Sequence, residues 1–213
     1  QAQHGGGGEE GGGGAPHPPR LCLLAKEPPP RARGGGVPRP PGDAPAPGGA
    51  DRGPSRRSCR EHTCVHWVPT TSDAPPSRAW ARRTLRMAEA TWTAHVEGLG
   101  FRRPVGDGTR GGDNRLDVYL IDLGPDVDGY CAPERRRSAR TASGYCVVDN
   151  DFAGADYPQG TPTSNLRVTL AHEIFHAVQF AYDVSEDRWM MEASATWAEE
   201  QVADTVNDNR QYL

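Results

Sequence analysis

The sequence reads Leu166-Arg167-Val168-Thr169-Leu170-Ala171-His172-Glu173-Ile174-Phe175-His176-Ala177-Val178-Gln179-Phe180 across its most informative stretch. Its apolar residues recur at steps of three and four, which predicts a helix. On a helix, His172 and His176 lie on one face at neighbouring turns, so both imidazoles can reach one metal ion. Glu173 is displaced around the helix, where its carboxylate can hydrogen-bond water at the metal without becoming a ligand. This pattern predicts a catalytic zinc site.

A zinc peptidase needs three protein ligands and an open fourth position, so a third ligand is expected downstream. Glu192 lies sixteen residues after His176 and begins a second predicted helix, at 189–202, after a loop long enough to reverse the chain. It is the best candidate. Asp183, seven residues after His176, is the rival, although it leaves little chain for a return. A metzincin would have a histidine six residues after His176, where this chain has Tyr182, so that class is excluded.

The second predicted helix carries a recognisable pattern. It reads Trp189-Met190-Met191-Glu192-Ala193-Ser194-Ala195-Thr196-Trp197-Ala198-Glu199. This resembles the third-ligand helix of the gluzincins, the zinc peptidases with a glutamate ligand. The closest pattern is Trp-x-x-Glu-Gly-x-Ala-x-x-x-Glu of the zinc aminopeptidases, with Ala193 in place of their glycine. Residues 170–179, with Gly144-Tyr145 and Val148-Asp149-Asn150-Asp151-Phe152, are similar to a bacterial group of secreted metalloproteases.

The resemblance covers about residues 59–213. It implies a zincin-like α+β fold, with a small sheet, a packing helix, an active-site helix and a third-ligand helix. It also implies hydrolysis of protein or peptide substrates by one zinc ion per chain. The ligands would be His172, His176 and Glu192, and Glu173 would be the general base.

Glu199 lies seven residues after Glu192, on the same face of the predicted helix. The resemblance implies that its carboxylate orients one of the ligand histidines. The alternative is a solvated surface glutamate beside Glu200.

The rest of the chain predicts an α+β order of elements. A packing helix is expected from an N-cap at Ser77 to the glycines at 98 and 100. Buried strands are expected at 116–123 and 145–148. We expect a polar loop at 126–144 between the two strands.

The N-terminal segment 1–57 is predicted to be disordered, with the metallopeptidase domain at 58–213. Residues 1–54 hold 15 of the 26 glycines and 12 of the 20 prolines, with no periodic apolar pattern. Such a composition cannot bury enough surface to offset its conformational entropy. The segment is either a linker or secretion tether, or spacer sequence without a function of its own.

The five cysteines fall as two local pairs, Cys59 with Cys64 and Cys131 with Cys146, and one outlier, Cys22. Two local pairs predict two disulfides, and hence an oxidising, extracellular compartment. Free buried thiols are one alternative. A structural zinc site is another, but neither pair has the Cys-x-x-Cys spacing.

The charge balance argues against a nucleic-acid partner. Residues 59–213 contain sixteen Lys and Arg against twenty-three Asp and Glu, a net charge of −7, whereas nucleic acids require a basic face. No run of eighteen or more apolar residues occurs, so we expect no membrane span.

Two other functions would use similar residues. A catalytically inactive, zinc-binding extracellular module would not need the base, which this chain retains as Glu173. A carboxylate-bridged iron site draws its ligands from four helices, and only two predicted helices offer any here. Hydrolysis by a zinc peptidase is therefore the preferred interpretation.

A gluzincin site also needs helices after the third ligand, to bury the ligand helices and to supply an oxyanion donor. After Glu200 the only candidate donor is Tyr212. We therefore expect this chain to be a fragment, truncated at its C-terminus. Such a fragment would bind zinc, hydrolyse peptides slowly and expose an apolar surface on the helix at 189–202.

Overall fold

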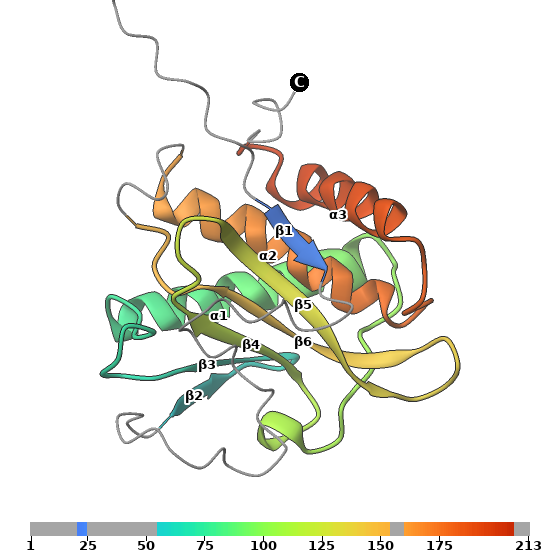
Figure 1. Cartoon of the computed structure of the whole chain (residues 1–213), viewed down its shortest axis with the longest axis horizontal. Helices are drawn as coiled ribbons and strands as arrows, with labels where there is room; N and C mark the ends of the chain where they lie inside the picture. The colour runs from blue at the N-terminus through green and yellow to red at the C-terminus, as the bar shows by residue number, and fades with distance from the viewer. Residues whose placement is uncertain (1–20, 25–54, 154–159, 207–213) are drawn as a thin grey trace, which may run out of the picture.

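Six strands form a mixed β-sheet, and helices cover one of its faces (Figure 1). The computed structural model describes residues 55–153 and 160–206, and the backbone of residues 21–24. The strand order is β5-β6-β4-β3-β2, and the short strand β1 (Leu21–Leu24) pairs in parallel with β5 at the edge. The predicted α+β class is confirmed.

Successive side chains along the strands point to opposite faces of the sheet. Besides β1, the strands are β2 (Arg56–Cys59), β3 (Thr63–Trp67), β4 (Leu116–Ile121), β5 (Val127–Arg136) and β6 (Ala142–Asp149). In β4, Leu116, Val118 and Leu120 join the main hydrophobic core, which also contains the buried face of the helices. Asp117 and Tyr119 point to the other face, as the two-residue period of a strand requires. The sequence therefore places β4 correctly to within two residues.

The polar loop predicted at 126–144 is wrong, because most of it forms β5. This strand pairs antiparallel with β6, from Gly129 opposite Val148 to Arg136 opposite Ala142. Gly129 and Pro133 interrupt the alternating apolar pattern by which a strand is recognised in a sequence. The register shifts next to Pro133, as expected because proline has no backbone N–H to donate to the neighbouring strand. The short hairpin of β2 and β3 was not predicted either.

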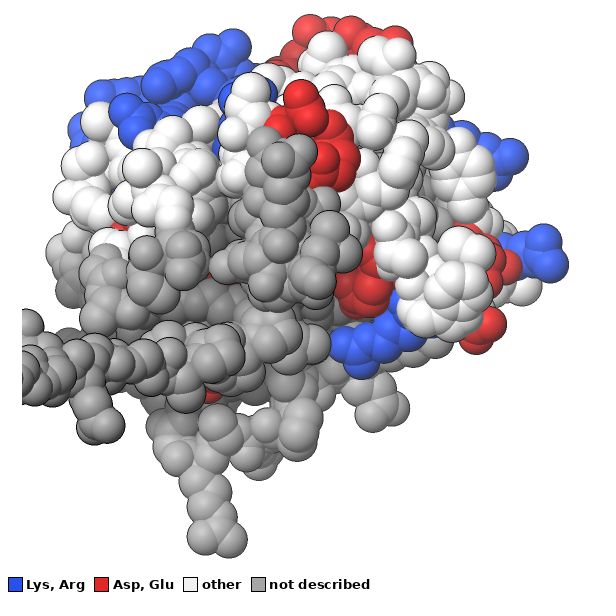
Figure 2. Space-filling model, turned by 90° about the horizontal axis from the view of Figure 1, so that it is seen from above, with Lys and Arg blue, Asp and Glu red and all other residues white. Residues whose placement is uncertain are grey.

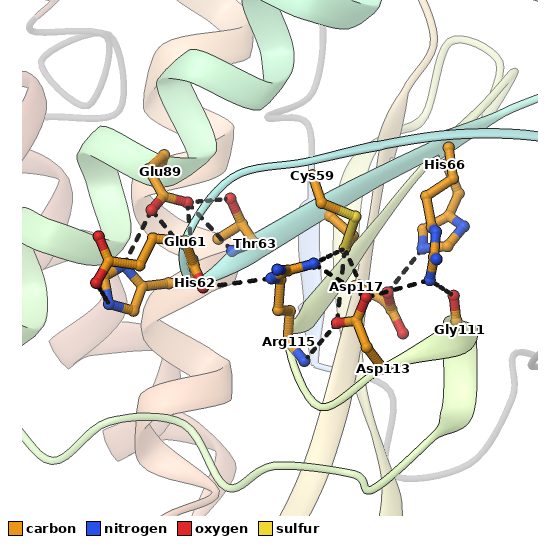
Figure 3. Close-up of a disulfide and its surroundings, with 12 residues drawn as sticks. Cys59, Glu61, His62, Thr63, His66, Glu89, Gly111, Asp113, Arg115 and Asp117 are labelled. Atoms are coloured by element: carbon orange, nitrogen blue, oxygen red, sulfur yellow. Dashed lines mark hydrogen bonds and ion pairs between the residues drawn. A yellow bond between two sulfur atoms is a disulfide. The ribbon is translucent and has the colours of Figure 1, made fainter.

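Helix α1 (Arg78–Thr93) packs on β3 and ends in the π-helical turn η1 (Ala94–Gly98). Its N-cap is Ser77, whose hydroxyl accepts a hydrogen bond from the Trp80 amide, as predicted. Near its C-terminal end, Glu89 accepts hydrogen bonds from the backbone amides of His62 and Thr63, both 3.1 Å away. These bonds, visible in Figure 3, fasten α1 to the turn between β2 and β3.

Helix α2 (Pro162–Gln179) lies over β5 and β6 and contacts α1 on the same face of the sheet. It begins four residues before the apolar pattern does, because Thr161 and Ser164 form a capping box and Pro162 occupies the first turn. Helix α3 (Arg188–Ala203) packs against α2, and no described helix is long and apolar enough to cross a membrane.

Both predicted disulfides are confirmed: Cys59 is bonded to Cys64 and Cys131 to Cys146. Each pair joins directly opposed residues of neighbouring antiparallel strands. The alternatives, free thiols or a four-cysteine zinc site, are therefore wrong for these residues. The side chain of Cys22 lies outside the described part of the chain.

The predicted boundary at residue 57 can be compared with the structure only in part. Residues 1–20 and 25–54 lie outside the described residues, so the prediction of disorder there stays a prediction. Within the segment 1–57, the structure describes β1 and the first two residues of β2, which begins at Arg56. The described fold therefore includes one short strand, β1, inside the segment predicted to be disordered, and β2 begins two residues before the predicted domain start at residue 58.

Figure 2 shows the charged side chains on the face that is seen when the molecule of Figure 1 is viewed from above. On this face, acidic and basic side chains form separate small groups among uncharged residues, and no described basic group extends across it. The prediction that the protein has no nucleic-acid partner stays a prediction.

Candidate metal centre

Helices α2 and α3 bring the three predicted ligands together. His172 and His176 lie on the buried side of α2, and Glu192 lies in the first turns of α3. The two imidazoles are almost completely buried, whereas the Glu192 side chain is 28 % exposed. Solvent therefore reaches this site at Glu192.

The geometry of the three side chains fits one zinc ion. Glu192 Oε2 lies 3.1 Å from Nε2 of His172 and 3.6 Å from Nε2 of His176. The three ligand atoms all lie within 4.8 Å of one another. A tetrahedral zinc ion with bonds of about 2.1 Å holds its ligand atoms about 3.4 Å apart. These three atoms can therefore bind one ion with small adjustments.

The other nitrogen of each imidazole is held by the protein. His172 Nδ1 is hydrogen-bonded to Glu199, and His176 Nδ1 lies 2.7 Å from Gln179 Oε1. Both Nε2 atoms consequently face Glu192. His176 Nε2 is fully buried and has no hydrogen-bond partner among the described residues, which is the arrangement expected of a nitrogen that binds a metal.

Glu199 occupies the position that the resemblance implied. Its side chain is only 12 % exposed and contacts His172, so the interpretation as a solvated surface glutamate is wrong. Gln179 was not predicted. Its spacing of three residues after His176 is a signal that the sequence contains, because residues at i and i+3 are neighbours on a helix.

The carboxylates around the imidazoles favour positive charge at this site. Burial disfavours the imidazolium of His172, but its hydrogen bonds with Glu192 and Glu199 outweigh burial and raise its pKa to about 10. Burial would raise the pKa of Glu192, yet the two imidazoles hold that pKa well below its usual range. Burial lowers the pKa of His176. A cation placed among these groups is thus electrostatically stabilised.

Glu173 is fully buried next to strand β5. Its Cγ lies so close to Gly129 that a β-carbon at that glycine would be 3.0 Å away. The sulfurs of Cys131 and Cys146 lie 2.7 and 3.4 Å from the Glu173 carbonyl oxygen. The disulfide between β5 and β6 therefore supports the helical turn that carries Glu173.

The other candidates from the sequence are not brought to this site. Asp183, the rival third ligand, lies in the loop after α2, where its carboxylate is 3.5 Å from Arg140 and accepts a hydrogen bond from the Ser185 amide. It does not belong to the group of side chains that lie close enough together to hold one metal ion. Tyr212, the candidate oxyanion donor, lies outside the described residues.

A second cluster of possible ligands surrounds the disulfide of Cys59 and Cys64 (Figure 3). Asp113 lies beside the two sulfurs, but its carboxylate is already paired with Arg57 at 3.3 Å and Arg115 at 3.0 Å. Sulfurs joined in a disulfide offer no thiolate to a metal. This cluster is therefore a structural network at the edge of the sheet.

Part of the surface of α3 is apolar. Trp189, Met190 and Trp197 are each more than 40 % exposed, as predicted for this helix. Next to them lies an apolar cavity of about 270 Å³, whose lining includes Phe101, Tyr182 and Trp197. These residues form a hydrophobic surface beside the metal centre.

Comparisons with protein-family models, with curated proteins and with solved structures find no match to this chain. The chemistry of the site is therefore inferred from its own residues. Two imidazole nitrogens and one carboxylate, with a buried glutamate next to His172 in the sequence, are a donor set suited to zinc.

Proposed function

We propose that this chain is a zinc-dependent peptidase, with His172, His176 and Glu192 as ligands and Glu173 as general base. The observation that carries the proposal is the convergence of both histidine Nε2 atoms on Glu192 Oε2. The opposite nitrogens of the two rings are held by Glu199 and by an amide. Histidines that bind a catalytic metal are oriented in this way.

In this proposal zinc, when bound, lowers the pKa of water and polarises the scissile carbonyl. Glu173 accepts a proton from the attacking water and later delivers it to the leaving amine. Glu173 is fully buried and lies one residue after the ligand His172 on α2. Glu192 completes the ligand set, and Glu199 keeps His172 in the orientation that its role requires.

We further propose that the fold is zincin-like and that the chain acts as a gluzincin. Support comes from the order of elements. After β2 and β3, the packing helix α1, the strands β4 to β6 with antiparallel β5, the active-site helix α2 and the third-ligand helix α3 follow one another along the chain. Support also comes from α3, which carries the third ligand and Glu199 on one face.

We propose an extracellular location and protein or peptide substrates. Two disulfides are consistent with an oxidising compartment, because the cytosol keeps most thiols reduced. The substrate proposal rests on the pairing of a zinc donor set with a buried general base. An inactive zinc-binding module would share the ligands but would not depend on Glu173.

The test is hydrolysis of casein by the purified protein, with and without a chelator and after zinc is restored. The Glu173→Gln variant should lose at least 99 % of the wild-type rate yet keep its zinc, because the ligands are intact. Glu97→Gln, at an exposed position of the π-helical turn η1, is the matched control and should keep the wild-type rate. A wild-type protein that binds zinc without chelator-sensitive hydrolysis would favour the inactive module.

A further inference from the structure

We propose that Gln179 is a positioning residue, which fixes the tautomer of His176 and couples His176 to the helix that carries Glu192. This inference rests on the zinc site proposed above. Gln179 is the last residue of α2, and its side-chain amide lies between the two ligand helices. The predicted set of ligands, His172, His176 and Glu192, does not require a glutamine at position 179.

The orientation of the Gln179 amide follows from its partners. Its nitrogen lies 2.8 Å from the Met191 carbonyl oxygen and 2.9 Å from Ser194 Oγ. A backbone carbonyl can only accept a hydrogen bond, so the amide group facing Met191 must be the NH₂ donor. Ser194 Oγ donates its own proton to the Met190 carbonyl, 2.6 Å away, and is left to accept. Gln179 Oε1 must therefore face His176.

This orientation fixes the proton on His176. Gln179 Oε1 can only accept, and it lies 2.7 Å from His176 Nδ1, so Nδ1 carries the hydrogen. The other ring nitrogen, Nε2, then carries a lone pair directed toward Glu192. A metal ligand needs this tautomer, since a protonated nitrogen cannot coordinate.

The same amide sets the position of α3 relative to α2. Its two donor bonds end at Met191 and Ser194, which flank Glu192 in the same turn. A displacement of α3 would therefore strain the bonds that orient His176. One neutral side chain thus links the second histidine ligand to the third ligand, a role that Glu199 fills for His172 from the opposite helix.

Two substitutions separate the two roles of Gln179. Gln179→Leu removes both the acceptor for His176 and the donors to α3. Gln179→Glu retains an acceptor for Nδ1 but has no donor for the Met191 carbonyl. Gln201→Leu, at an exposed position of α3, is the matched control because it makes the same chemical change outside the site.

The first measurement is the imidazole ¹⁵N NMR spectrum of each metal-free protein, which reports the tautomer of His176 without any zinc. We expect the Nδ1–H tautomer in the wild type, Gln179→Glu and the control, and its loss in Gln179→Leu. The same wild-type tautomer in Gln179→Leu would overturn the inference.

The second measurement is zinc affinity by competition with a chromogenic chelator, with thermal unfolding of each metal-free protein alongside. Gln179→Leu should bind zinc about 10- to 100-fold more weakly. Gln179→Glu should lose thermal stability but stay within about threefold of the wild-type affinity, because His176 keeps an acceptor. Equal affinities for Gln179→Leu and Gln201→Leu would overturn the inference while leaving the proposed function intact. A wild type that binds no zinc would instead refute the proposed function, and the tautomer would still test Gln179.

Discussion

Replacing Gly129 of β5 by alanine should disturb the contact between β5 and the turn of α2 that carries Glu173. A β-carbon at this position would lie 2.8 Å from Thr169 Cγ2, 2.9 Å from the Val147 carbonyl oxygen and 3.0 Å from Glu173 Cγ. Comfortable contacts between carbon atoms are about 3.5 to 4.0 Å. Val147 belongs to β6, the strand paired with β5, so its carbonyl cannot swing aside. The helix or the strand must therefore move by about 0.5 to 1 Å.

Two effects of different size follow from this displacement. Overpacking of a buried contact costs about 1 to 3 kcal/mol, which corresponds to a loss of roughly 3 to 10 °C in melting temperature for a domain of this size. A displacement of about 1 Å in a catalytic group costs on the order of a hundredfold in turnover. Zinc affinity should change much less, because Glu173 is not a ligand.

Thermal unfolding, zinc titration and casein hydrolysis of the Gly129→Ala variant measure stability, zinc affinity and turnover separately. The matched control is Gly98→Ala, because a β-carbon at Gly98 meets only the Thr93 carbonyl oxygen, at 3.9 Å. If Gly129→Ala melts and turns over like the wild type, α2 does not pack against β5 as described. If its zinc affinity falls as steeply as its turnover, Glu173 is not acting separately from the ligands.

Three further substitutions test other parts of the structure. Glu199→Leu removes the partner of His172 Nδ1 and should weaken zinc binding about 10- to 100-fold by titration, whereas Glu200→Leu should not. Burial and the charges of Asp117 and Glu134 raise the pKa of Asp107 to about 7. The folded protein therefore holds this proton more tightly than the unfolded chain does. The resulting stabilisation is fully present below about pH 4 and is lost as the pH rises through 7. Asp107→Asn should therefore increase the free energy of unfolding by about 1 to 3 kcal/mol at pH 8 and change it little at pH 4; an equal effect at both pH values would contradict this assignment. Trp197→Ser should reduce the fluorescence of a bound hydrophobic dye, because Trp197 is 45 % exposed beside the apolar cavity; unchanged dye binding would place the apolar surface elsewhere.

The helices could be predicted from the sequence because each carries a local signal. The period of three and four residues identifies α1 and α2, and Ser77 marks the start of α1. The two histidines of the site share one face of one helix, so their convergence needs no tertiary information. Glu192 was predicted from its place at the start of the next helix and from the resemblance to the gluzincins, and the structure brings it to the same point.

The remaining features depend on contacts between distant parts of the chain. Gly129 and Pro133 weaken the local signal of β5, and the strand is stabilised by its pairing with β6. Gln179 has an ordinary spacing on α2, and its role emerges only when the Met191 carbonyl and Ser194 meet its amide from α3. The sequence of α2 alone does not predict contacts with α3. The role of Gln179 therefore could not be predicted from the pattern of α2.

The most direct test of the zinc site is the zinc content per chain of the dialysed protein, measured by atomic absorption. The wild type and the Asp183→Ala variant should each retain one zinc ion per chain, because Asp183 lies outside the ligand group. Glu192→Ala should retain almost none, since it removes one of three ligands. Stoichiometric zinc in Glu192→Ala, or its loss in Asp183→Ala, would contradict the site described here.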